Sequence, residues 1–214
     1  MRPVYIWTVA GLLWLAFFAW YTNLRGPLTA DEVDHWLSVM EERSPGSEPS
    51  ERLRKFLSED DGDDFLMVNV IEMKAEPDRI EGVDPGETSQ QVLGRYMAYM
   101  WPALLKRACH PIIGGGAVAD TMEVWGIDGG GRWSSAAMMR YRSRRDMLEI
   151  AGSPEFNGPH EFKLAAMERT IAFPIETFLS PGDPRGLLGL ILFGTAAALH
   201  LLFGRSSGAA PLRP

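Results

Sequence analysis

The sequence FLMVNVIEM at residues 65–73 decides the fold of this chain, because it is almost continuously apolar between two polar segments. The acidic residues 59–64 precede it, and a polar loop at 76–87 follows it. A short apolar run bounded by turn residues is typical of a strand that is buried inside a sheet. We therefore predict that residues 65–73 form the first strand of the fold.

The sequence after this strand predicts a helix and then a pair of strands. Residues 89–108 carry apolar side chains along one helical face, and Pro102 should kink or break this helix. Residues 110–126 and 132–142 are interpreted as two strands. The glycine-rich segment at 127–131 suits the hairpin turn that would join them.

A second helix and a last strand complete the pattern. Ser143 caps this helix, which breaks at Gly152, restarts at 153–156 and runs toward Arg169. Residues 170–178 are interpreted as the closing strand. The order βαββαβ is that of the ferredoxin-like plait, so the expected fold class is α+β.

Within this pattern the chain resembles the dimeric α/β-barrel superfamily, and above all its small uncharacterised members. The first strand carries the resemblance together with three further segments, at residues 96–102, 110–115 and 141–170, the last of which contains Ser153-Pro154-Glu155-Phe156. It covers roughly residues 64–178. The resemblance implies a homodimer in which two sheets pair into one barrel. Some members of the superfamily bind haem, oxygenate polyketides or isomerise lactones, which makes a small-molecule site worth seeking.

Two short helices should precede the domain. Thr29 can cap the first helix, and Glu32 completes a capping box. Residues 44–47 break this helix, and 50–58 form the second one. The acidic residues 59–64 lack the ligand order of an EF-hand, so we interpret them as a solvated turn rather than a calcium site.

Apolar segments at both ends of the chain are long enough to cross a membrane as helices. Residues 4–21 would span about 27 Å at about 1.5 Å per residue. A cleaved signal peptide is the alternative, but its apolar region is shorter and ends at a small-residue site that this segment lacks. Residues 186–204 form the second segment, in which we interpret His200 as an interfacial histidine rather than a proton relay. Gly194 and Ala198 would let another helix approach closely.

The predicted organisation therefore has five parts. They are an N-terminal transmembrane anchor at 1–26, a helical lead-in at 27–63, the barrel domain at 64–180, a C-terminal transmembrane helix at 186–204 and a tail at 205–214.

The distribution of charge limits the partners and the orientation. Residues 27–185 hold all 28 acidic residues and 17 of the 21 basic ones, for a formal charge of −11. Such a surface repels nucleic acid, which is therefore not expected as a partner. The expected partners are the lipid bilayer, through the two apolar segments, a second copy, as the resemblance implies, and a membrane protein to which the chain could be an accessory subunit. Four basic groups flank the apolar segments on the side of the termini, and two flank them on the side of the domain. Because basic groups are enriched on the cytoplasmic side, this difference favours cytoplasmic termini in a bacterial inner membrane and an exported domain.

Several patterns that suggest chemistry have a plainer interpretation. Cys109 and His110 are neighbours in a predicted strand, so they should point to opposite faces and not form a nucleophile and base pair. The pattern G-x-G-x-x-A at 114–119 is not followed by the helix that a dinucleotide site needs. A single cysteine excludes an internal disulfide and a multi-cysteine zinc site, and no spacing of a metal enzyme occurs. His35 should be exposed.

The best candidate site lies where the long helix should meet the sheet. Its predicted ligand-binding residues are Tyr96, Met100 and Trp101 as an apolar wall, with Arg140 and His160 at a polar end. Two alternatives remain beside it: the aromatic residues can equally form core, and Arg140 and Arg142 can pair with acids of the domain.

No set of catalytic residues and no cofactor follows from the sequence. The function expected is therefore a membrane-anchored, non-catalytic barrel domain that binds a small apolar molecule or serves as an accessory subunit. The alternative is a membrane-bound enzyme of the monooxygenase or isomerase kind with a pocket in the barrel.

Overall fold

The computed structural model describes residues 3–43, 51–178 and 180–203. The chain divides into two compact units. One is a domain at residues 25–177, and the other consists of the two terminal segments.

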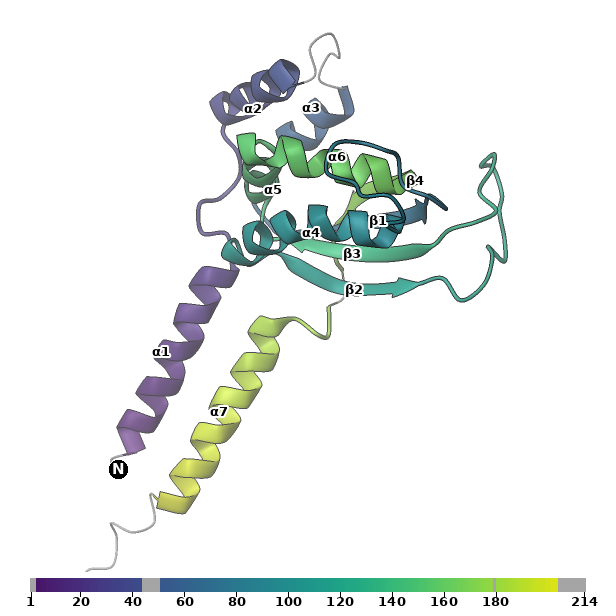
Figure 1. The fold of residues 1–214 in the computed structure, drawn as a ribbon. Helices are drawn as coiled ribbons and strands as arrows, with labels where there is room; N and C mark the ends of the chain where they lie inside the picture. The colour runs from purple at the N-terminus through teal and green to yellow at the C-terminus, as the bar shows by residue number, and fades with distance from the viewer. Residues whose placement is uncertain (1–2, 44–50, 179, 204–214) are drawn as a thin grey trace, which may run out of the picture. The chain divides into compact units, whose positions relative to one another are not determined.

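A four-stranded antiparallel sheet forms the centre of the domain (Figure 1). Its strands lie in the order β2-β3-β1-β4. Their bounds are Phe65–Met73 for β1, His110–Gly116 for β2, Ser135–Tyr141 for β3 and Met167–Ile175 for β4. β1 pairs with β3 on one side and β4 on the other, which explains its apolar sequence, and its predicted bounds are confirmed.

Three helices and a 3-10 turn cover one face of this sheet (Figure 1). They are α4 at Ser89–Lys106, α5 at Arg144–Ala151, the turn η1 at Pro154–Phe156 and α6 at Asn157–Ala166. Thr88 and Gln91 form a capping box at the start of α4, and the Ser143 hydroxyl accepts the Asp146 N–H at the start of α5. The buried residues of this layer include Tyr96, Met100, Leu104, Cys109 and Ile150.

Several predicted boundaries are wrong. α4 continues through Pro102 to Lys106, so the proline does not break it. β2 stops at Gly116, because its ladder with β3 ends at the pair Gly116 and Ser135. Residues 117–134, predicted as strand, turn and strand, form one long loop. β4 runs over Met167–Ile175 rather than 170–178, because α6 already ends at Ala166.

The two lead-in helices pack onto α5. They are α2 at Ala30–Arg43 and α3 at Glu51–Ser58. Val33, Leu37 and Leu57 bury their side chains against Leu148. The capping box is confirmed, because the Thr29 N–H donates to Glu32 Oε2 at 2.9 Å and the Glu32 N–H donates to Thr29 Oγ1 at 3.2 Å. The predicted break at 44–47 and the first residue of the range 50–58 lie outside the described residues.

The acidic segment after α3 is solvated only in part: Glu59, Asp61 and Asp63 are exposed, as predicted, but Asp60 and Asp64 are not. The Asp60 side chain is only 1% exposed, accepts the Leu28 N–H at 2.7 Å and lies 3.4 Å from the Arg144 guanidinium. Asp64 accepts a hydrogen bond from Arg140 Nε at 2.9 Å. Both acids therefore hold distant parts of the domain together, through residues that sequence spacing alone does not connect.

The terminal unit is a pair of helices, α1 at Pro3–Tyr21 and α7 at Pro184–Phe203. Both are long and apolar enough to cross a membrane. Ile6 and Ala10 pack against Ala196, and Trp7 Nε1 donates to His200 Nδ1 at 3.0 Å. Gly194, one of the small residues expected to admit another helix, has open space around its Cα and does not face α1. The predicted tail at 205–214 lies outside the described residues.

Candidate ligand-binding site

The sheet face opposite the helices is apolar. Residues directly paired across an antiparallel ladder point to the same face, and alternate residues of a strand share that face. Val68 pairs with Met138 and Phe173, and Met138 also pairs with Ile113, so these four side chains share one face. Met139 and Tyr141 pack against the helical core, which places Met138 on the opposite side of β3. We call this surface the open face.

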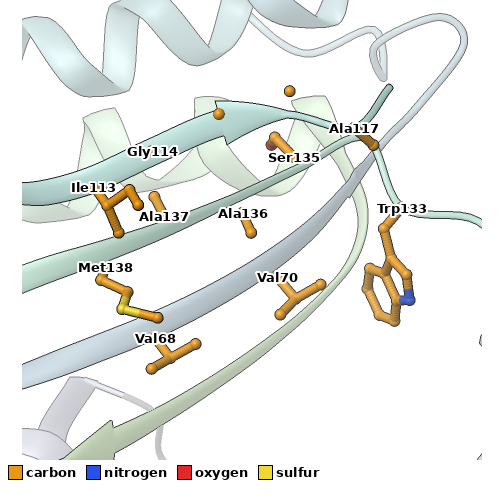
Figure 2. Close-up of a pocket in the computed structure, with 12 residues that line it drawn as sticks. Val68, Val70, Ile113, Gly114, Ala117, Trp133, Ser135, Ala136, Ala137 and Met138 are labelled. Atoms are coloured by element: carbon orange, nitrogen blue, oxygen red, sulfur yellow. The ribbon is translucent and has the colours of Figure 1, made fainter. Parts of the chain in front are cut away.

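A groove with a volume of about 410 Å³ lies on the open face. Figure 2 shows the side chains of Val68, Val70, Met138 and Ile113 on the same side of the strands, with the Trp133 ring at one end. The groove is hollow because its centre carries the smallest residues. A Cβ atom at Gly115 would meet nothing within 4 Å, and its ladder partner is Ala136.

A second hollow of about 290 Å³ adjoins the groove and shares Val70 and Trp133 with it. It lies between the open face and the loop 117–134, and its lining includes Ile171, Thr121, Glu123, Val124 and Trp125. The guanidinium of Arg169 lies 4.8 Å from the centre of the Trp133 ring, and Arg169 Nε donates to Glu72 at 2.6 Å. The indole at the junction of the two hollows is therefore held in place by a paired cation.

The chemistry of this surface favours an apolar ligand. Among the described residues that line the two hollows, Glu123 alone is ionisable, and the polar groups of the groove itself are the Ser135 hydroxyl, the Trp133 indole N–H and backbone groups. A volume of this size is within the range of small-molecule sites, which are mostly apolar. Among its described lining residues, the groove holds no ionisable side chain that could act as a general base.

Three of the five residues predicted from the sequence lie together, on the helical side of the sheet. Tyr96 and Met100 are buried in the same core cluster. The His160 ring lies 6.3 Å from the Tyr96 ring, and both contact Phe156. Burial raises the pKa of Tyr96 to about 12, and burial together with the charge of Lys163 lowers the pKa of His160.

The other two residues lie elsewhere. The Trp101 side chain is 40% exposed. Arg140 lies two residues after Met138 and therefore on the opposite side of β3 from Tyr141 and the Tyr96 cluster. Its Nη1 donates to the Ala108 carbonyl at 2.8 Å and its Nε to Asp64. None of the five residues lines either hollow, and their role in binding a ligand stays a prediction.

The remaining candidates have structural partners. Arg142 pairs with Asp146 at 2.8 Å, so Arg140 and Arg142 both follow the alternative in which they pair with acids of the domain. Cys109 is buried, burial raises the pKa of its thiol to about 11, and its sulfur accepts the Arg142 N–H at 3.4 Å. His110 Nδ1 lies 3.0 Å from its neighbour's carbonyl oxygen. His35 is exposed on α2.

The groove could not be predicted from the sequence, because its position depends on the register between the strands. Small residues at 114–117 and 135–137 are visible in the sequence, and consecutive glycines in a strand often mark a place where another group approaches closely. Only the pairing of Gly115 with Ala136 shows that two of them meet on the open face.

The domain resembles solved structures, although no protein-family model and no curated protein matches the chain. Two crystal structures of RPA0582, a protein of unknown function from Rhodopseudomonas palustris, match at 16% identity. The methylated form has a TM-score of 0.52 and covers 63% of this chain and 94% of its own. The other form has a TM-score of 0.49 and covers 62% and 95%.

Further matches have lower TM-scores. A dimeric protein of unknown function and ferredoxin-like fold from Bacteroides fragilis has 13% identity and a TM-score of 0.32, and covers 53% of this chain and 96% of its own. A hydroxynitrile lyase from Passiflora edulis has 11% identity and a TM-score of 0.37, and covers 56% and 98%. These low identities bear on the fold alone. The domain has the ferredoxin-like α+β fold that the sequence resemblance implied.

Proposed function

We propose that this protein is a membrane-anchored, non-catalytic barrel domain that binds a small apolar molecule in the groove on its open face. The observation that carries the proposal is the lining of the groove. Its described side chains are apolar or small, with no ionisable group among them. Such a site gains affinity by removing apolar ligand surface from water, and its described side chains offer no ionisable acid or base to transform what it binds.

The proposed location follows from the terminal helices and the charge pattern. α1 and α7 would make the protein a two-pass protein of a bacterial inner membrane. The excess of basic groups at the termini favours the soluble domain on the non-cytoplasmic side. An apolar ligand suits this place, because it would reach the domain from the bilayer. Service as an accessory subunit of a membrane complex is compatible with the same arrangement.

A homodimer is part of the proposal. Ile113, Ile171 and Phe173 are exposed on the open face, beside the partly buried Val70 and Met138. An apolar sheet face requires a covering layer, and in the barrel proteins that this domain resembles the cover is a second copy.

The test uses a substitution that fills the groove. Gly115→Leu places a side chain in open space on a strand, so it should remove the ligand volume without straining the backbone. The matched control is Gly158→Leu, because the Cα of Gly158 in α6 also has open space around it. Native mass spectrometry of the intact chains, released from detergent micelles, should find a bound apolar molecule on the wild type and on the control. Gly115→Leu should lose at least nine-tenths of it.

Two outcomes would count against the proposal. A ligand that is retained by Gly115→Leu occupies another site. If that ligand is instead lost from His160→Ala, the hypothesis of an enzyme of the monooxygenase or isomerase kind is favoured. His160 and Tyr96 lie together, and Lys163 Nζ is 5.7 Å from the centre of the Tyr96 ring.

A further inference from the structure

The loop at residues 117–134, called the arm below, exposes large apolar side chains. Val118, Met122 and Trp125 have exposed fractions of 103%, 93% and 92%. Figure 1 shows the arm extending beyond the ends of β2 and β3. Scattered apolar residues are common on surfaces, but several large ones on one projecting loop indicate a contact surface.

The arm is attached to the sheet by specific hydrogen bonds. The Ala117 N–H donates to the Ser134 carbonyl at 2.8 Å, and the Ser134 N–H donates to the Ile71 carbonyl at 2.8 Å. Within the arm, the Thr121 hydroxyl donates to the Gly130 carbonyl at 3.0 Å. The apolar side chains are therefore presented from a fixed base.

The arm and the segment that leads to α7 leave the sheet near opposite ends of β1. β4 leads to α7 from its end at Ile175, which lies beside Leu66 near the start of β1. The arm joins β3 at Ser135, which lies beside Ile71 near the end of β1. These ends are separated by five residues of β1, or roughly 17 Å at about 3.3 Å per residue.

The net negative charge of the arm argues against the bilayer as its partner. The arm carries Asp120, Glu123 and Asp128 against the single basic residue Arg132. Anionic lipid headgroups would repel this surface. A protein surface is therefore the better partner.

The area of the open face and the symmetry of a dimer together favour a second copy of the chain as the partner. Four strands about 4.8 Å apart and roughly 25 Å long present about 500 Å² for each partner, or about 1,000 Å² for two. Stable interfaces bury about 1,200–2,000 Å² in total. The sheet faces alone fall short of this range, and two arms supply the missing apolar area. A symmetric pair uses both surfaces at once, because each chain brings one arm and one open face.

We propose that the arm of each protomer docks on the second copy, so that the apolar site becomes a composite cavity closed by residues of both chains. The proposal rests on the homodimer proposed above. The hollow between the arm and its own open face would then receive side chains of the second copy.

The test compares exposed apolar residues of the arm with equally apolar residues on the helices. Met122→Ser with Trp125→Ser removes the contact, and Val118→Ser is a second, independent variant. Leu105→Ser with Leu164→Ser is the control, because these leucines are exposed on α4 and α6. The dissociation constant of the dimer is measured by energy transfer between labelled full-length chains diluted in nonionic detergent micelles.

We expect both arm variants to raise the dissociation constant of the dimer at least tenfold, while the control stays within twofold of the wild type. Unchanged circular dichroism would show that the variants are folded. Equal constants for the arm variants and the wild type would overturn the proposal, as would a wild type that is monomeric at every concentration. Ligand occupancy of the wild type in the same micelles separates this proposal from the proposed function. If the wild type is a monomer that carries ligand, the groove remains the ligand site and the docking of the arm is wrong. If the wild type is a dimer without ligand and the arm variants weaken it, only the proposed ligand binding is wrong.

Discussion

Glu32 joins the lead-in to the domain through one arginine. Arg145 donates to both oxygens of the carboxylate at 2.9 Å, and the same guanidinium donates to the carbonyl groups of Gly26 and Pro27 at 3.0 Å. The hydrogen bonds from Arg145, followed by the one from the Thr29 N–H, lower the pKa of Glu32 from 4.5 to about 2.

This lowered pKa predicts a loss of stability in acid. Because the pKa of Glu32 is lower in the folded chain than in the unfolded one, its contribution is fully present above about pH 4.5 and is lost as the pH falls toward about 2. The melting temperature of Glu32→Gln should therefore lie below that of the wild type at neutral pH, and the gap should narrow progressively below about pH 4.5. Glu41→Gln, an exposed change on the same helix, should show no such trend. A gap that stays constant down to pH 3 would refute this role.

At the scale of elements, the turn between α3 and β1 is pressed against the segment that follows α1. Gly62 has a φ of 85°, and a Cβ atom there would lie 2.7 Å from the backbone of Gly26 and of Pro27. Gly86 has a similar φ of 88°, but its Cβ would meet nothing within 4 Å.

These two glycines form a matched pair of tests. Gly86→Ala should cost about 1–2 kcal/mol in the free energy of unfolding, because only the left-handed conformation opposes it. Gly62→Ala should cost clearly more, because the backbone of residues 26 and 27 must also move. Chemical denaturation of both variants measures the difference, and equal costs would show that the turn and this segment are not tightly packed.

The elements that were predicted well are those fixed by local sequence. β1 and the starts of α2 and α5 follow from an apolar run and from capping residues within a few positions. The ends of β2 and β3 could not be predicted, because a strand continues only where a neighbour pairs with it. The ladder between β2 and β3 ends at the pair Gly116 and Ser135, and residues 117–134 form the arm.

The candidate site was less predictable than the fold. Tyr96 and His160 were expected to lie close together, and they do. Arg140 was assigned to the same site, but its partner Asp64 is 76 residues away, and only the strand register places the two together. The groove likewise combines residues from three strands and a loop, whose meeting is a property of the tertiary structure.

For the whole molecule, the two terminal helices predict firm attachment to a membrane. α1 and α7 each offer an apolar length close to the thickness of a bilayer, and aromatic side chains lie near both ends of α1. Alkaline carbonate should therefore leave the protein in the membrane pellet, and its mature N-terminus should be the uncleaved one. A soluble form that begins near Trp20 would show instead that α1 is a signal sequence.

The pairing of α1 with α7 also has a consequence for biosynthesis, because α1 is made well before α7. The two helices contact each other through Trp7 and His200, yet 162 residues lie between Tyr21 and Pro184. At about 5–20 residues per second, a ribosome needs roughly 10–30 s to make the intervening chain. During that interval α1 is without its neighbour, and the indole of Trp7 is without its acceptor. If the protein is membrane-anchored as proposed, α1 must be able to reside in the bilayer alone, and its almost uniformly apolar surface would meet this requirement before the chain is finished.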